Sequence, residues 1–262
     1  MKEATVDDLR KVWNVNSDYG VLDSLVKNLK ENDGKKINDF LHLPIHLPFI
    51  RQELKNLPKN SKILEAGCGF GHWVFWLAEQ GYETVGVDLA EKTIATAKKY
   101  AKINNKTNCK FIEADIRQLP IKDNYFDCIF SFGVIEHFRN PEPILKEFKR
   151  VLKPNGRIFL SMPNQYSFHT LTRPLSKMLG QWNLDYESSY TQGSLKKLFK
   201  KSGFEVSRCG IMPGGELFGC GVASLPFVGR RVFKLLSRLS LYIENHQSLF
   251  GFWLYGSAKK TF

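Results

Sequence analysis

Three glycines alternate with other residues in the stretch ILEAGCGFG, which covers residues 63–71. They follow a short apolar run that ends at Glu65. Alternating glycines are typical of a backbone that another group approaches closely, because glycine has no Cβ. Two more acidic side chains, Asp88 and Asp115, come at the ends of later apolar runs. A carboxylate offers two acceptor oxygens, which suits a pair of hydroxyl groups such as those of a ribose.

The elements that must position these residues can be predicted from residues 61–163, where strand patterns alternate with helix patterns. This alternation favours an α/β fold with a doubly wound, mostly parallel sheet and right-handed crossovers. The predicted strands are KILEAG, ETVGVDLA, CKFIEADI, FDCIFSFGVI and RIFLSMP, and the predicted helices are HWVFWLAEQG, EKTIATAKKYAKIN and PEPILKEFKRVL.

In such a sheet, ligands bind beyond the carboxyl ends of the strands. The segments that leave the first four predicted strands are 65–71, 88–89, 115–116 and 131–137. A single acid at a strand end is most simply a cap for the following helix. Three acids at neighbouring strand ends favour a ligand.

The glycine spacing matches neither of two common nucleotide-binding motifs. A dinucleotide fingerprint requires G-x-G-x-x-G, but His72 stands where the third glycine would be. A Walker loop requires Gly-Lys-Ser/Thr, and the stretch has none. What remains is E-x-G-x-G-x-G, with Asp88 placed 17 residues after Gly71.

At this point the sequence resembles the class I S-adenosylmethionine-dependent methyltransferases, in particular the small-molecule branch that includes the quinone-biosynthesis methyltransferases. The resemblance covers roughly residues 60–163 and is carried by ILEAGCGFG, VGVDLA, FIEADIRQLPIKDNYFDCIFSFGVIEHF and VLKPNGRIFLSMPN, in that order. It implies a Rossmann-like, seven-stranded sheet and S-adenosyl-L-methionine as the cofactor, with S-adenosyl-L-homocysteine as its product.

The resemblance also implies roles for individual residues. Asp88 would hold the ribose hydroxyls, and Asp115 would accept a hydrogen bond from the adenine amino group. Glu65 and the glycine loop would border the methionine moiety. The full set of cofactor residues implied is Glu65, Gly67, Cys68, Gly69, Asp88, Leu89, Asp115, Ile116, Phe132 and Gly133. No metal ion is implied.

Methyl transfer is a direct displacement at a sulfonium carbon, so the protein mainly aligns donor and acceptor. An oxygen or carbon acceptor must still lose a proton, and a histidine is well suited to accept it near neutral pH. His137 follows the fourth predicted strand and is the candidate base. The alternative is that it organises the cofactor loop, and His46 and His169 are comparable candidates.

Three additions surround the predicted cofactor core of residues 61–163. Residues 1–60 are expected to form a helical cap over the pocket. Residues 164–190 form a long connection that is typical of a functional lid. Residues 191–262 complete the sheet and contain an insertion at about 213–247. The candidate acceptor-binding residues in the lid are Tyr166, His169, Tyr186, Glu187 and Tyr190, and packing of these side chains onto the core is the alternative.

The third addition contains a basic amphipathic helix pattern. Arg230, Lys234 and Arg238 recur at intervals of four, opposite a run of aliphatic residues. Such a helix could lie on an anionic membrane surface and admit a lipid-like acceptor, or it could pack its apolar face on its own protein. A peripheral membrane contact therefore stays open.

Charge and composition limit the remaining classes of function. The net charge is +12, and residues 170–262 carry 13 basic and 5 acidic residues, a net +8. Five scattered cysteines form no C-x-x-C pair, which argues against a disulfide framework or a zinc knuckle. No secretory signal is recognisable, so a cytoplasmic protein is expected. The alternatives to a small-molecule methyltransferase are an RNA methyltransferase, suggested by the charge, and a non-catalytic cofactor-binding protein at a membrane. The absence of an Asn/Asp-Pro-Pro-aromatic motif and of an RNA-binding module argues against nucleic acid. The oligomeric state stays open.

Overall fold

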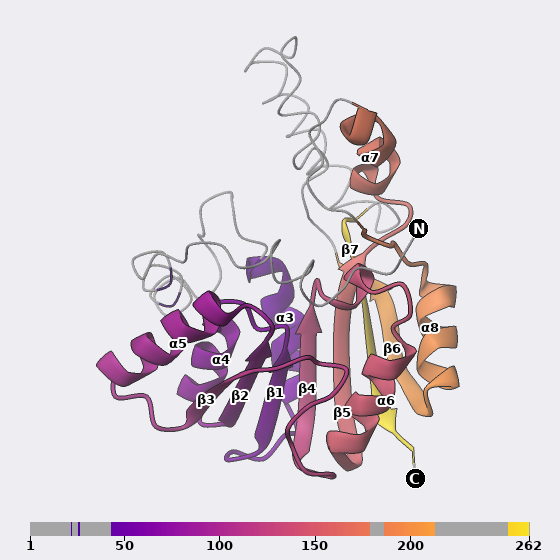
Figure 1. The fold of residues 1–262 in the computed structure, drawn as a ribbon. Coiled ribbons are helices and arrows are strands. Elements are labelled where there is room, and N and C mark those ends of the chain that lie inside the picture. The colour runs from indigo at the N-terminus through magenta and orange to yellow at the C-terminus, as the bar shows by residue number, and fades with distance from the viewer. Residues whose placement is uncertain (1–21, 23–25, 27–42, 179–185, 213–250, 262) are drawn as a thin grey trace.

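The computed structural model describes Leu22, Val26 and residues 43–178, 186–212 and 251–261. Seven strands form one sheet in the order β3-β2-β1-β4-β5-β7-β6 (Figure 1). The strands are β1 (Lys62–Ala66), β2 (Glu83–Asp88), β3 (Cys109–Glu113), β4 (Phe126–Phe132), β5 (Leu152–Pro163), β6 (Phe204–Ile211) and β7 (Trp253–Lys260). The helices are α3 (Leu43–Leu54), α4 (His72–Glu79), α5 (Glu91–Ile103), the short 3₁₀ helix η1 (Ile135–His137), α6 (Glu142–Val151), α7 (Phe168–Met178) and α8 (Gln192–Lys201).

The sheet is parallel except for one strand. Strands β3, β2, β1, β4 and β5 pair in parallel, whereas β7 runs antiparallel to both β5 and β6. The prediction of a doubly wound, mostly parallel seven-stranded sheet is therefore confirmed. The carboxyl ends of β1, β2 and β4 lie at one edge of the sheet, which is where a ligand is expected.

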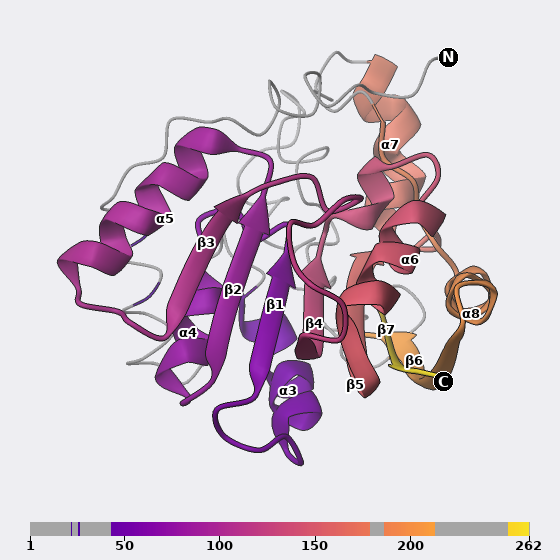
Figure 2. The ribbon, with the colours of Figure 1, turned by 60° about the horizontal axis from the view of Figure 1, so that its bottom comes forward.

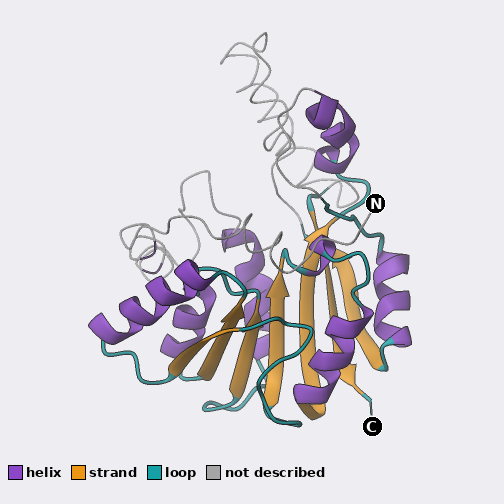
Figure 3. Cartoon of the chain, viewed as in Figure 1, coloured by secondary structure: helices purple, strands orange, loops and turns teal. Residues whose placement is uncertain are grey.

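Helices cover both faces of this sheet (Figures 2 and 3). On one face, α6 packs against β5 and buries Phe148, and α8 packs against β6 and β7 and buries Phe199. On the other face, α3 and α4 pack against Phe130 and Phe159. Helix α5 joins α4 in a third cluster, which also contains Leu22 and Val26. Alternate residues of each central strand thus enter opposite cores, as strand geometry requires.

Two predicted elements differ from the structure, one in its length and the other in its position. Strand β5 begins at Leu152, whereas the predicted strand RIFLSMP begins at Arg157. Asn155, in the added part, takes a φ of 61°. Helix α3 was expected in a cap over the pocket. It lies against the face of the sheet, because its buried apolar residues Leu47 and Ile50 belong to the same core cluster as the aromatic side chains of the strands.

The remaining predictions for the additions lie partly outside the described residues. Most of the cap at residues 1–60 lies outside the described residues, and so does the insertion at 213–247, which contains Arg230, Lys234 and Arg238. In the described parts of the chain, no helix has the length and apolar character needed to cross a bilayer.

Candidate functional site

A pocket of about 320 Å³ opens at the carboxyl ends of β1, β2 and β4. Its wall combines the glycine loop after β1, the turn after β2, the start of the loop after β3 and the segment after β4. The lining residues are Gly67, Gly69, Phe70, Asp88, Leu89, Ala90, Thr93, Ile116, Phe132, Gly133, Val134, His137 and Phe138.

The three glycines of the loop differ in what excludes a side chain from them. A Cβ at Gly67 would lie 2.3 Å from the side chain of Val134, and a Cβ at Gly71 would lie 2.2 Å from the ring of Phe111. A Cβ at Gly69 would meet no protein atom within 4 Å. The first and third glycines are therefore required by the packing of the protein itself. The middle one leaves open space on the pocket wall, as expected where a ligand approaches the backbone.

Asp88 closes β2 and joins this loop to the next helix. Its Oδ2 accepts a hydrogen bond from the backbone N–H of Gly69 at 2.8 Å, and its Oδ1 accepts one from the N–H of Ala90 at 2.9 Å. These two bonds fix the carboxylate at the pocket wall. Because a carboxylate has about four acceptor positions, it can still accept hydrogen bonds from a ligand.

Two of the other candidate cofactor residues lie behind the glycine loop. Glu65 is buried, and its Oε2 accepts a hydrogen bond from the N–H of Val74 in the first turn of α4 at 3.1 Å. Burial raises the pKa of this carboxyl group well above its ordinary value. Cys68 is buried too, and burial likewise raises the pKa of its thiol. Neither side chain lines the pocket.

The loop after β3 contributes Ile116 to the pocket, whereas Asp115 does not line it. The Asp115 carboxylate accepts hydrogen bonds from the backbone N–H and the guanidinium group of Arg117, with the shortest at 2.7 Å. Arg117 also lies over the ring of Phe138, at 5.4 Å from its centroid. Asp115 thus helps to hold the pocket wall in place.

The segment after β4 supplies Phe132, Gly133 and His137. Burial lowers the pKa of His137 below its ordinary value, so the imidazole is neutral near pH 7. Its Nδ1 lies 3.3 Å from the carbonyl oxygen of Tyr186. Since a carbonyl oxygen only accepts, Nδ1 carries the proton in this contact and Nε2 is the basic nitrogen.

Of the candidate acceptor residues of the 164–190 segment, the four whose side chains the structure describes do not line the pocket. The side chain of Tyr166 is about half exposed, and Tyr190 pairs with Asn164 at the end of β5. Glu187 forms a buried ion pair of 2.5 Å with Arg173 on α7. Tyr186 lies under the guanidinium group of Arg139. His169 lies on α7, and its side chain is outside the described residues.

Several pocket residues escaped the sequence analysis: Phe70, Ala90, Thr93, Val134 and Phe138. All but Thr93 are adjacent in the sequence to a residue that was named, but their apolar side chains carry no chemical signal of their own. His46 was named as a candidate base comparable to His137, and it does not line the pocket. It is buried on α3, bonds Ser161 at 2.9 Å and packs edge-on against Phe132. Among the described residues, no cluster of acidic, histidine or cysteine side chains could hold a metal ion.

Comparison with known proteins places this geometry in context. Residues 64–160 match a family model described as a methyltransferase domain. A ubiquinone biosynthesis O-methyltransferase of Idiomarina loihiensis is 34% identical over 125 residues, which are 47% of this chain and 50% of that protein. A sterol 4-C-methyltransferase of Caenorhabditis elegans is 28% identical over 130 residues, or 49% of this chain and 38% of that protein. The chain thus spans about half the length, or less, of these curated relatives.

A solved structure shares the fold over almost the whole chain. It is the magnesium protoporphyrin IX methyltransferase of Synechocystis, determined with bound S-adenosylhomocysteine. The sequence identity is 16% and the TM-score is 0.60, with 98% of this chain and 99% of that chain covered. At this identity the likeness concerns the fold alone.

Proposed function

We propose that the chain, whose residues 64–160 match a methyltransferase domain, transfers a methyl group from S-adenosylmethionine to a small-molecule acceptor. The observation that carries the proposal is the open space at Gly69 beside the fixed carboxylate of Asp88. The backbone of Gly69 leaves room for an amino-acid chain, and the carboxylate of Asp88 can bind the hydroxyl groups of a ribose. A ligand that combines these two parts therefore suits the pocket.

The residues of the pocket fit this cofactor in type and placement. Asp88 would accept hydrogen bonds from the ribose hydroxyls. Leu89 and Ile116 would flank the adenine ring, because they give that part of the pocket apolar walls. Gly67, Gly69, Phe132 and Gly133 would border the methionine part.

Three further residues would support the cofactor less directly. Glu65 and Cys68 would hold the glycine loop from behind, since both are buried beneath it. Asp115 would reach the adenine amino group only while keeping its ion pair with Arg117. Its contribution to affinity should therefore be smaller than that of Asp88.

When bound, S-adenosylmethionine supplies a methyl group that its sulfonium charge has already activated. The protein then has to align the acceptor, exclude water and remove a proton. We assign the last task to Nε2 of His137, because this nitrogen is basic in the tautomer that the Tyr186 carbonyl favours. The lowered pKa of His137 keeps it neutral and able to accept a proton at pH 7.

The acceptor is proposed as a small or lipid-like molecule. The curated relatives are named for ubiquinone and sterol methylation, which supports this class over RNA. The identity of the acceptor atom is a matter for experiment.

The test is to incubate the protein with methyl-labelled S-adenosylmethionine and separate metabolite, lipid and RNA pools. We expect label to enter the metabolite or lipid pool with the wild type and not with Asp88→Ala. The variant Glu205→Gln, on the distant strand β6, is a control that should keep the activity. Label in the RNA pool alone, or in no pool, would contradict the proposal.

A further inference from the structure

Glu136 stands out among the buried acids because part of its carboxyl group has no partner. The residue is 2% exposed, yet its Oε2 makes no hydrogen bond. By contrast, buried Glu65 accepts a hydrogen bond from a backbone N–H, and buried Glu53 pairs with Arg208. An unsatisfied buried polar atom is costly, and native proteins keep few of them. The side chain of Glu136 does not line the pocket in this structure, so a ligand would meet this oxygen only after the side chain turns toward Gly133.

The carboxyl group lies next to the pocket wall. Its Oε1 is 3.6 Å from the position that a Cβ at Gly133 would occupy, and Gly133 lines the pocket. The ring of Trp253 lies 3.2 Å from the same position. Gly133 and the neighbouring Phe132 are the residues that we place at the methionine end of the cofactor. Glu136 therefore lies directly behind Gly133, at the end of the pocket where the proposed function has the acceptor meet the methyl group.

The surroundings favour the neutral form of this carboxyl group. Burial raises the pKa of Glu136 well above its ordinary value, and the charge of Glu187 raises it further. A hydrogen bond from its own backbone amide and the charge of Arg173 act in the opposite direction. Arg173 nevertheless directs its Nη1 and Nη2 atoms to Glu187, at 2.7 and 2.5 Å. A protonated carboxyl group can donate a hydrogen bond as well as accept one.

The hydrogen bonds that join this loop to Ser188 come from the backbone of Glu136 and not from its side chain. The backbone carbonyl of Glu136 accepts hydrogen bonds from both the N–H and the hydroxyl group of Ser188, at 2.9 and 3.0 Å. Replacing the side chain leaves these backbone bonds available. A variant at Glu136 can therefore report on ligand binding separately from loop structure.

We propose that the Glu136 carboxyl group is a specificity-determining residue that donates a hydrogen bond to an oxygen atom of the acceptor. It would hold this oxygen while His137, the next residue, accepts the proton that the acceptor loses. The inference rests on the proposed function and restricts it to acceptors that carry an oxygen near the methylated atom. An acceptor without such an oxygen would leave the buried carboxyl group unsatisfied and would be rejected.

The experiment measures binding of 4-nitrophenol and 4-nitrocatechol to the complex of the full chain with S-adenosylhomocysteine. The variants are Glu136→Ala and Glu136→Gln, because the glutamine amide still donates a hydrogen bond in a similar shape. Glu142→Gln is the matched control, since this exposed acid of α6 pairs with Lys201 on the surface. Thermal unfolding and affinity for S-adenosylhomocysteine are measured for every variant.

We compare the phenol that the wild type binds more tightly. We expect Glu136→Ala to weaken its binding at least about tenfold and Glu136→Gln to weaken it less than about threefold. Affinity for S-adenosylhomocysteine should stay within about twofold in all variants. Equal binding by wild type and Glu136→Ala overturns the inference, as does a loss in Glu136→Gln as large as in Glu136→Ala. Wild type that binds neither phenol also overturns it.

A second readout needs no acceptor. Carboxyl-carbon NMR of protein labelled at glutamate, with Glu136→Gln to assign the signal, should show Glu136 protonated at pH 7. A carboxylate signal at that pH contradicts the inference. Failure of the proposed function itself is distinguishable, because wild type would then not bind S-adenosylhomocysteine.

Discussion

At the scale of single residues, Gly69 and Gly71 should respond differently to the same substitution. Gly71→Ala places a Cβ 2.2 Å from Phe111 at a φ of 75°, so it should destabilise the fold by about 2–4 kcal/mol. Gly69→Ala meets open space, so it should cost only about 1–2 kcal/mol for its φ of 49°. It should nevertheless lower affinity for S-adenosylhomocysteine at least about tenfold. Urea unfolding and calorimetry check the pair, and a Gly69→Ala protein with wild-type affinity would exclude close approach of the ligand there.

Asp88 and Asp115 provide a second contrast. Asp88→Ala should weaken S-adenosylhomocysteine binding at least about a hundredfold, because a ribose diol would lose two charge-assisted bonds of about 1.5–3 kcal/mol each. Asp115→Ala should weaken it less than about tenfold, since this acid is occupied by Arg117. Titration calorimetry measures both, and Asp88→Asn tests the need for charge in the same shape. The reverse order of effects would place the ribose at the end of β3.

His72 should make the fold sensitive to acid. Burial, followed by the charge of His46, lowers the pKa of His72 from 6.5 to about 4. Its Nδ1 is buried without a partner. Between these pKa values the unfolded chain binds a proton that the folded protein does not, so stability falls as pH falls from about 6.5 to about 4. From pH 7 to 5 the wild type should lose about 2 kcal/mol more than His72→Gln. Urea unfolding at both pH values decides this, and parallel losses would refute it.

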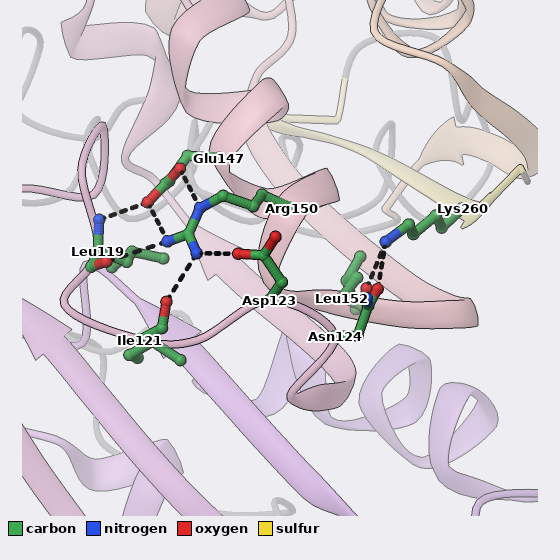
Figure 4. Close-up of polar contacts among 8 residues, drawn as sticks. All are labelled: Leu119, Ile121, Asp123, Asn124, Glu147, Arg150, Leu152 and Lys260. Atoms are coloured by element: carbon green, nitrogen blue, oxygen red, sulfur yellow. Dashed lines mark hydrogen bonds and ion pairs between the residues drawn. The ribbon is translucent and has the colours of Figure 1, made fainter.

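At the scale of elements, Arg150 of α6 ties down the connection between β3 and β4 (Figure 4). Its guanidinium group donates to the carbonyl oxygens of Leu119 and Ile121 at 3.0 and 2.8 Å, and to Glu147 at 2.7 Å. Glu147 in turn accepts a hydrogen bond from the N–H of Leu119. The same connection carries Ile116 into the pocket.

Arg150→Lys should therefore destabilise the fold by about 2 kcal/mol, because a lysine cannot make both carbonyl bonds in this planar arrangement. Arg139→Lys is the matched control, since it keeps a cation over Tyr186 and should change stability by less than about 0.5 kcal/mol. Urea unfolding measures both. Equal stabilities of the two variants would mean that the Arg150 contacts contribute nothing net.

The same scale shows what could be predicted from the sequence. Periodicity and glycine punctuation located the strands and helices of 61–163, because local patterns determine which faces are apolar. The partners of those faces could not be predicted. That Gly71 is required by Phe111, a side chain 40 positions away, follows only from the pairing of β2 with β3. Likewise, nothing in the local sequence of α3 indicates whether it covers the pocket or the sheet.

Some residues of the candidate site could likewise be predicted from the sequence, and others could not. Strand ends and glycine spacing identified Gly69, Asp88 and Leu89, because chain topology alone brings strand ends together. The unpartnered state of Glu136 could not be predicted, since it depends on Arg173 binding Glu187 instead. Tyr186 was expected in the acceptor site through its side chain, whereas its backbone carbonyl is what contacts His137.

At the scale of the whole molecule, cofactor binding should stabilise the fold. S-adenosylhomocysteine at a hundred times its Kd should add about 2.7 kcal/mol and raise the midpoint of thermal unfolding by about 5–10 °C. NAD at the same concentration should cause no shift and should not compete, because His72 replaces the third glycine of a dinucleotide fingerprint. Thermal shift and competition calorimetry test this. Stabilisation by NAD alone would reassign the pocket.

Strand β7 is the last strand of the described chain, yet it lies between β5 and β6. A polypeptide leaves the ribosome with its amino end first. Until residue 260 has emerged, β5 therefore has an unpaired edge and β6 has no neighbouring strand. Exposed strand edges attract other chains, so the nascent protein is prone to aggregate until β7 has been made. Trp253, which packs beside Gly133, also arrives only then. A chain stalled before β7 would therefore have a finished glycine loop but an incomplete acceptor end, which delays any methyl transfer until residues 253–260 have been made.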